Sequence, residues 1–313
     1  MSKLETNKSQ KMQVSLKTNK YKGILLPLLL GGFLIFSPQW LNAQDDLLEM
    51  LEDTPPTETY TVSTFKGTRV INSQSVDIQP AKELQFSISH RFGALNTGIQ
   101  KFWGLDEAVI RLGFEYGITD RWAVGLGRSK YQATYDFYSK FKILEQTEGK
   151  DTFPLTMVLN SNMALRGSGF DQPEVDEVFV NRLFYTHQLL VARKFAWGSL
   201  QLMPTYTHNN IRELLVESND MYAMGLAGRI KLTNRWSFLF DYYYLIDDEL
   251  KTVFQEPLAL SLELETGGHV FQFIFSNTNH MTEKLFLTRT QGQWLNGDIH
   301  FGFNISRTIP FHR

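Results

Sequence analysis

Apolar and polar residues alternate with a period of two in runs of about ten along most of the chain. In residues 108–118, for example, apolar side chains occupy every second position and alternate with arginine, glycine and glutamate. This period is typical of β-strands that have one apolar face and one small or polar face. We predict twelve strands, near 84–92, 108–118, 121–129, 137–144, 153–165, 182–194, 199–208, 221–231, 235–245, 257–264, 268–276 and 298–307. The faces of 137–144 and 182–194 are less distinct, so ten strands are the alternative.

The connections between the predicted strands alternate between long and short. The long ones lie near 93–107, 130–136, 166–181, 209–220, 246–256 and 277–297, and the short ones near 119–120, 195–198, 232–234 and 265–267, with one of intermediate length at 145–152. Long and short connections therefore gather at opposite ends of the strands, as in barrels with short periplasmic turns and long external loops. The predicted fold class is all-β, an antiparallel transmembrane β-barrel of about twelve strands.

A soluble β-barrel or sandwich is the alternative, because it also alternates but hides its apolar face inside. Here the apolar face carries phenylalanine, tyrosine, tryptophan and leucine, and the other face carries glycine and charged residues. A soluble barrel of twelve strands could not bury so many aromatic side chains without a second layer. An apolar face turned to lipid and a charged lumen explain the pattern more simply.

The first 43 residues have the layout of a secretory signal peptide. Lysines precede the apolar run 23–38, and Ala43 offers a small residue for cleavage. A single membrane anchor is the alternative, but the run has only 16 residues and contains proline and two adjacent glycines. We predict a signal peptide over 1–43, a flexible acidic tail over 44–64 and a barrel over 65–313, with secretion to the outer membrane.

The amino-acid composition excludes several kinds of site and partner. The chain has 313 residues and no cysteine, which excludes disulfides, thiolate metal sites, a cysteine nucleophile and a lipidated cysteine. The net charge of −2 gives no case for nucleic acid as a partner. Six acidic residues and no basic one lie in 44–58, which favours a solvated tail.

Several segments resemble a known family. An uncharacterised family of Gram-negative outer-membrane β-barrels, defined only as a domain of unknown function, is similar to this chain at 104–129, His90–Gly93, 269–273, Asn277, 281–283 and 302–307. The resemblance covers about 65–311. It implies an outer-membrane barrel, and it brings neither an activity nor a set of functional residues.

Five charged residues fall on the predicted inward face, and we expect them to line the lumen: Arg91, Arg111, Glu115, Arg229 and Asp241. Charges in a lumen must pair or stay hydrated. They either line a selective path for a small solute or ion, or pair into a structural plug that closes a narrow pore. Both interpretations stay open.

Trp122 and Trp236 each follow a tight turn, in Thr119-Asp120-Arg121 and Thr233-Asn234-Arg235. At that height we expect both indoles in the interfacial aromatic belt. The alternative is an ordinary hairpin of a soluble protein.

We expect no cofactor, no metal and no enzyme. The seven histidines lack the spacing of a helical metal motif, and no nucleophile-elbow pattern is present. His187 and His208 resemble lipid-facing histidines of membrane lipid enzymes only in short fragments. The predicted function is passage of a small solute or ion. The alternative is a non-conducting barrel that docks a periplasmic or surface partner through the acidic tail 44–58 and the loop 277–297. The expected partners are outer-membrane lipid and, during biogenesis, the insertion machinery.

Overall fold

A computed structural model of the chain describes residues 59–61, 63–149, 152–168, 178–212 and 218–311. The predicted signal peptide and most of the predicted acidic tail lie outside the described residues. Among the described helices, none is long and apolar enough to cross a membrane.

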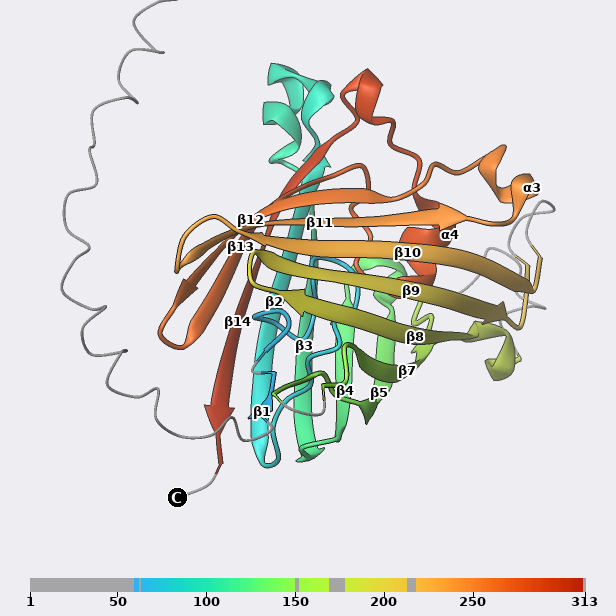
Figure 1. Cartoon of the computed structure of the whole chain (residues 1–313). Coiled ribbons are helices and arrows are strands. Elements are labelled where there is room, and N and C mark those ends of the chain that lie inside the picture. Colours follow the sequence, from blue (N-terminus) through green and yellow to red (C-terminus); the bar gives the residue numbers. More distant parts are fainter. Residues whose placement is uncertain (1–58, 62, 150–151, 169–177, 213–217, 312–313) are drawn as a thin grey trace, which may run out of the picture. The chain divides into compact units, whose positions relative to one another are not determined.

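Twelve antiparallel strands close into a barrel (Figure 1), which confirms the predicted fold class and strand count. Each strand pairs with its neighbours in the chain, and β14 pairs with β2 to close the ring. The strands are β2 (Glu83–Ala94), β3 (Ala108–Thr119), β4 (Trp122–Ser129), β5 (Tyr135–Leu144), β7 (Thr156–Leu165), β8 (Leu183–Phe195), β9 (Gly198–Asn209), β10 (Asp220–Lys231), β11 (Trp236–Leu245), β12 (Leu258–Thr266), β13 (His269–Ser276) and β14 (His300–Pro310).

The inward and outward faces follow the sequence pattern. In β3 the arginine, glutamate and glycines are buried inside the barrel, and the alternating Leu112, Phe114 and Tyr116 are about 40% exposed on its outside. Glycine on the inward face makes room for large neighbours. A Cβ on Gly127 would lie 2.2 Å from the Arg111 guanidinium.

Short turns collect at one end of the barrel, the turn end, and long connections at the other, the loop end. The loop end carries the short helices η2 (Leu95–Thr97), η3 (Ile99–Gly104), η4 (Tyr131–Ala133), η5 (Phe179–Arg182), α3 (Asp248–Lys251) and η6 (Trp294–Asn296). At the turn end, β1 (Thr59–Tyr60) pairs with β6 (Thr147–Glu148), which lies between β5 and β7.

Two segments fill the barrel interior. Residues 63–82, named here the plug segment, bond to inward side chains of β3, β5, β9, β11, β13 and β14, so they lie within the ring (Figure 1). The helix α4 (Glu283–Arg289) is buried along six of its seven residues. The sequence pattern predicts no element over 65–82 and an external loop over 277–297, so both inward segments are new findings.

The hydrophobic core also lies inside the barrel. Val70, Ile71 and Val76 of the plug segment belong to one buried cluster with inward side chains of the wall and with Phe286 of α4. The wall contributes Leu190, Met203, Leu239 and Tyr243 to this cluster, among others. The inner wall is therefore less uniformly polar than the sequence pattern suggests.

Candidate functional site in the barrel interior

All five charged residues predicted for the lumen point into the barrel, and none is more than 5% exposed: Arg91, Arg111, Glu115, Arg229 and Asp241. Burial of a charge is tolerated only with a partner. Arg111 and Arg229 pair within the wall, Arg91 and Asp241 hold the plug segment, and Glu115 does both.

Three ion pairs connect one wall strand with another. Arg111 on β3 binds Asp136 on β5 through two hydrogen bonds, of 3.0 Å from Nε and 2.5 Å from Nη2. The Lys140 ammonium lies 3.2 Å from Oε2 of Glu115, and Arg229 Nε lies 3.0 Å from Oε1 of Glu263.

The partners Asp136, Lys140 and Glu263 are absent from the predicted site. Each pair joins strands two apart in the ring, β3 with β5 or β10 with β12. Such a pairing depends on register and barrel curvature, which alternation does not reveal. The only sequence signal is that Lys140 and Glu263 are charged residues within strand patterns.

Asp241 and Arg91 anchor the turn of the plug segment. The Asp241 carboxylate accepts hydrogen bonds from the backbone N–H groups of Asn72 (3.0 Å) and Ser73 (2.8 Å) and from the Ser73 hydroxyl (2.5 Å). The Arg91 guanidinium donates to the side-chain oxygens of Asn72 (2.8 Å) and Asn304 (3.0 Å). The three Asp241 hydrogen bonds and the contact of Arg91 with Asn72 therefore exist only while the plug segment is in place, whereas the contact of Arg91 with Asn304 lies within the wall.

Amide side chains of the wall form hydrogen bonds with the plug backbone, as the backbone of a neighbouring strand would. Gln201 accepts from the N–H of Val76 and donates to the carbonyl of Gln74, both at 2.8 Å. Gln272 donates to the carbonyl of Val70 at 2.6 Å, and Asn304 to that of Ile71 at 3.0 Å. Buried backbone groups need such partners, so these side chains explain how an aperiodic segment is ordered inside the barrel.

The plug segment and α4 are joined to each other. Glu283, fully buried, lies 3.0 Å from the Arg69 guanidinium and accepts a 3.0 Å hydrogen bond from the Gln74 amide. Movement of α4 would therefore remove two polar contacts from the plug segment.

The buried interior is balanced in charge. Among the described residues, the buried cations are Arg91, Arg111, Lys140, Arg229 and Lys284, and the buried carboxylates are Glu115, Asp136, Asp241, Glu263 and Glu283. Several other buried polar atoms, such as Oγ of Ser237 and Ser261 and Oδ1 of Asn160, have no hydrogen-bond partner in the described protein. Buried polar atoms of this kind are usually satisfied by water.

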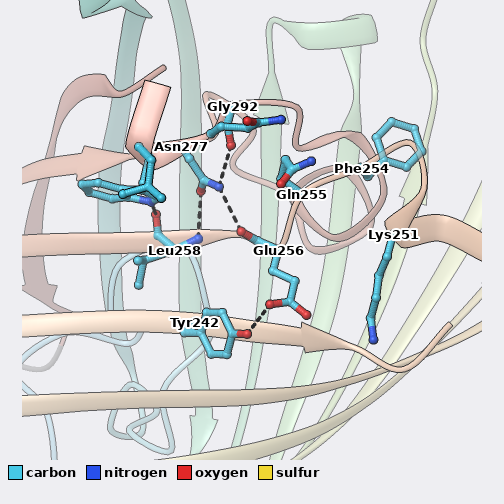
Figure 2. A pocket seen from close by; sticks show the side chains of 11 residues that line it. Tyr242, Lys251, Phe254, Gln255, Glu256, Leu258, Asn277 and Gly292 are labelled. Carbon is cyan, nitrogen blue, oxygen red and sulfur yellow. Dashed lines mark hydrogen bonds between the residues drawn. The ribbon is translucent and has the colours of Figure 1, made fainter. Parts of the chain in front are cut away.

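A separate pocket of about 400 Å³ lies at the loop end beside β11 and β12 (Figure 2). Asn277 closes one side, because its amide donates to the carbonyls of Glu256 and Gly292 at 2.9 Å and its oxygen accepts from the Leu258 N–H. Tyr242 donates a hydrogen bond to the Glu256 carboxylate. These contacts fasten the loop ends together.

The two tryptophans assigned to the interface point outward at the turn end. Trp122 is 41% exposed and Trp236 38% exposed. The Trp122 indole donates a 2.9 Å hydrogen bond to the Ser139 hydroxyl. An exposed indole with a polar contact is the arrangement that suits a membrane interface.

The outward wall also holds a serine–histidine contact. Ser161 Oγ lies 2.9 Å from Nδ1 of His187, and His208 lies 2.7 Å from Asp220 on neighbouring strands. In the described part of the chain no carboxylate bonds to His187, so this pair lacks the third group that orients a catalytic base. The described residues also contain no cluster of three or more residues that could hold a metal ion.

The comparison with protein families defines the class of this protein as a membrane-bound β-barrel. The family described as membrane bound beta barrel domain (DUF5777) matches residues 65–309. The chain therefore belongs to this family, which confirms the resemblance to a barrel family of unknown function.

Solved structures give only remote matches. The NanC porin is 7% identical, with a TM-score of 0.45, and the match covers 72% of this chain and 98% of that one. The KdgM porin in complex with disordered oligogalacturonate is 7% identical, with a TM-score of 0.44 and coverages of 74% and 99%. OmpF of Salmonella typhi is 6% identical, with a TM-score of 0.35 and coverages of 72% and 97%. No curated protein gives a significant match.

Proposed function

We propose that this protein is a plugged channel of the outer membrane, which passes a small polar solute or ion when the plug segment and α4 rearrange. The observation that carries the proposal is the inner wall, where eight buried charged side chains are arranged as ion pairs and plug anchors. Buried charge is costly, and a barrel that needed only to be filled could use apolar side chains instead.

The balance of charge indicates what such a channel would take. Five buried cations and five buried carboxylates favour neither sign of ion over the whole path. Amide side chains, including Gln201, Gln272 and Asn304, would face a solute once the plug segment had moved. A small polar solute with hydrogen-bonding groups is the class that fits this lining.

The second candidate function is a non-conducting barrel that docks a periplasmic or surface partner. The buried apolar cluster between the plug segment, α4 and the wall favours it, because apolar contact stabilises a permanently filled interior. Much of the loop 277–297, which the sequence suggested as a docking surface, is buried in this structure. Docking would therefore fall to the acidic residues before the plug segment.

Membrane location and partners complete the proposal. Outward aromatic and aliphatic side chains on every second strand position favour contact with outer-membrane lipid. The insertion machinery during biogenesis and the cleaved leader over 1–43 are the corresponding proposals for its route. The proposed orientation places the turn end, where β1 pairs with β6, in the periplasm.

The test is ion current across a planar bilayer that contains the purified protein. The channel proposal expects discrete openings that become more frequent in Asp241→Ala, which removes a plug anchor. Arg111→Ala should shift the ion selectivity toward cations, because it leaves Asp136 unpaired in the wall. A folded, inserted protein that stays silent in all three forms would favour the non-conducting barrel instead.

A further inference from the structure

The loop that carries α4 holds a histidine in a setting suited to a neutral ring. His280 is 7% exposed, and its ring lies edge-on to Tyr131 of η4, with the centroids 4.3 Å apart. One ring nitrogen is engaged by the backbone carbonyl of Arg289. The other, Nδ1, is buried without a hydrogen-bond partner.

The charged groups that act most strongly on His280 are cationic, whereas the nearby carboxylates of Asp298 and Glu107 act on His300. Lys284 and Arg289 approach from α4 and His300 from the start of β14, and each disfavours a positive charge on the ring. Lys284 is held over the Phe184 ring at 4.1 Å and Arg289 over the Phe254 ring at 5.3 Å. A protonated His280 would therefore add a cation among fixed cations and bury a new N–H donor without an acceptor.

We propose that His280 is a proton-sensitive latch, and that its protonation releases the loop 277–297 with α4 from the barrel interior. This inference rests on the proposed function, since it names what triggers rearrangement of the plug. Release of α4 would also break the contacts of Glu283 with Arg69 and Gln74, which loosens the plug segment.

The direction of the pH effect follows from the imidazole. Burial, reinforced by the neighbouring cations, lowers the pKa of His280 from 6.5 to about 4. The released loop binds a proton more readily than the docked loop between these two values. Docking is therefore fully stable above about pH 6.5 and weakens as the pH falls toward 4.

The size of the effect follows from the same two pKa values. Between about pH 7.5 and pH 5, the equilibrium for loop release should rise about 30-fold, and below pH 4 it should level off. We therefore expect α4 to be exposed more often in acid than at neutral pH.

The natural absence of cysteine allows a direct test with single cysteines in the same loop. Leu287→Cys reports on α4, where the side chain is 4% exposed, and Leu295→Cys reports on a fully exposed position. The ratio of their maleimide-labelling rates in detergent cancels the effect of pH on thiol chemistry. We expect this ratio to rise about 30-fold from about pH 7.5 to pH 5.

Variants of His280 test whether this residue causes the pH dependence of the labelling ratio. His280→Gln, or His280→Phe if the first variant folds poorly, should leave the labelling ratio independent of pH. His208→Gln is the matched control, because His208 is a half-buried histidine of the outward wall, paired with Asp220, and should keep the full rise. A ratio that stays flat in the single-cysteine chains that keep His280, or that still rises in both His280 variants, would overturn the latch.

The labelling experiment tests the latch separately from the conductance experiment that tests the channel. If Asp241→Ala conducts and the labelling ratio does not depend on pH, the channel proposal is supported and the latch proposal is refuted. If the ratio rises in acid but no form conducts, the latch stands as a property of a non-conducting barrel.

Discussion

Replacing Asp241 by alanine should release the plug segment selectively. The Asp241 carboxylate accepts three hydrogen bonds from Asn72 and Ser73, at 2.5–3.0 Å, and is 3% exposed. A hydrogen bond to a charged group contributes about 1.5–3 kcal/mol. The three bonds share one acceptor, and their loss also removes the desolvation cost of a buried charge, so they do not add. We expect a loss of about 3 kcal/mol, on the order of a 100-fold shift toward the released plug.

Thiol labelling of the plug segment measures this shift. Ile71→Cys is suitable because Ile71 is 1% exposed and lies beside the anchored turn. In the Asp241→Ala background, we expect the labelling rate of this cysteine to rise on the order of 100-fold when opening precedes labelling. Electrophoretic mobility before and after heating would show that the barrel itself stays folded.

Asp136 provides the matched control. It is also a buried aspartate, 2% exposed, but its ion pair is with Arg111 of the wall. Asp136→Ala should therefore change the labelling rate at position 71 by less than about threefold, although it destabilises the barrel. Equal acceleration in both variants, or none in either, would refute the assignment of Asp241 as a plug anchor.

Three further predictions follow from other contacts. Gly117→Ala should destabilise the docked plug by about 1–3 kcal/mol, because a Cβ there would lie 1.9 Å from the Pro80 carbonyl oxygen. The control Gly267→Ala, whose Cβ would have nothing within 4 Å, should change the free energy of unfolding by no more than about 0.5 kcal/mol. Urea titration in vesicles measures both variants. Trp122→Phe should lower the free energy of unfolding in the same titration by about 1 kcal/mol, because the hydrogen bond to Ser139 is lost; no change would remove that contact from the account. Purified protein should release no fatty acid from phospholipid vesicles, and Ser161→Ala should leave this unchanged; release that disappears in Ser161→Ala and His187→Ala would show an enzyme instead.

The wall of the barrel was predictable because it follows a local rule. Alternation in β3 assigns Arg111 and Glu115 to one face and Leu112 and Phe114 to the other, and the structure agrees. The alternation of long and short connections also predicts which end of each strand faces the loop end of the barrel. Even the less distinct runs at 137–144 and 182–194 are strands, β5 and β8.

The filling of the barrel was not predictable by the same rule. Residues 63–82 have no period, and their order comes from wall side chains such as Gln201 and Asn304 that are distant in sequence. Asp136 fell in a predicted loop, at 130–136, yet it is the partner of Arg111. These contacts depend on barrel closure and register, which a single sequence does not specify.

The most direct test of the central claim is a reversible lock between the plug segment and the wall. The hydroxyl of Ser73 lies 2.5 Å from the Asp241 carboxylate, so Ser73→Cys with Asp241→Cys brings two thiols within reach of a disulfide in a chain that has no other cysteine. The account predicts a silent bilayer when the pair is oxidised and discrete openings when it is reduced. Equal current in the oxidised and reduced forms, or silence in both at neutral and acid pH, would contradict it.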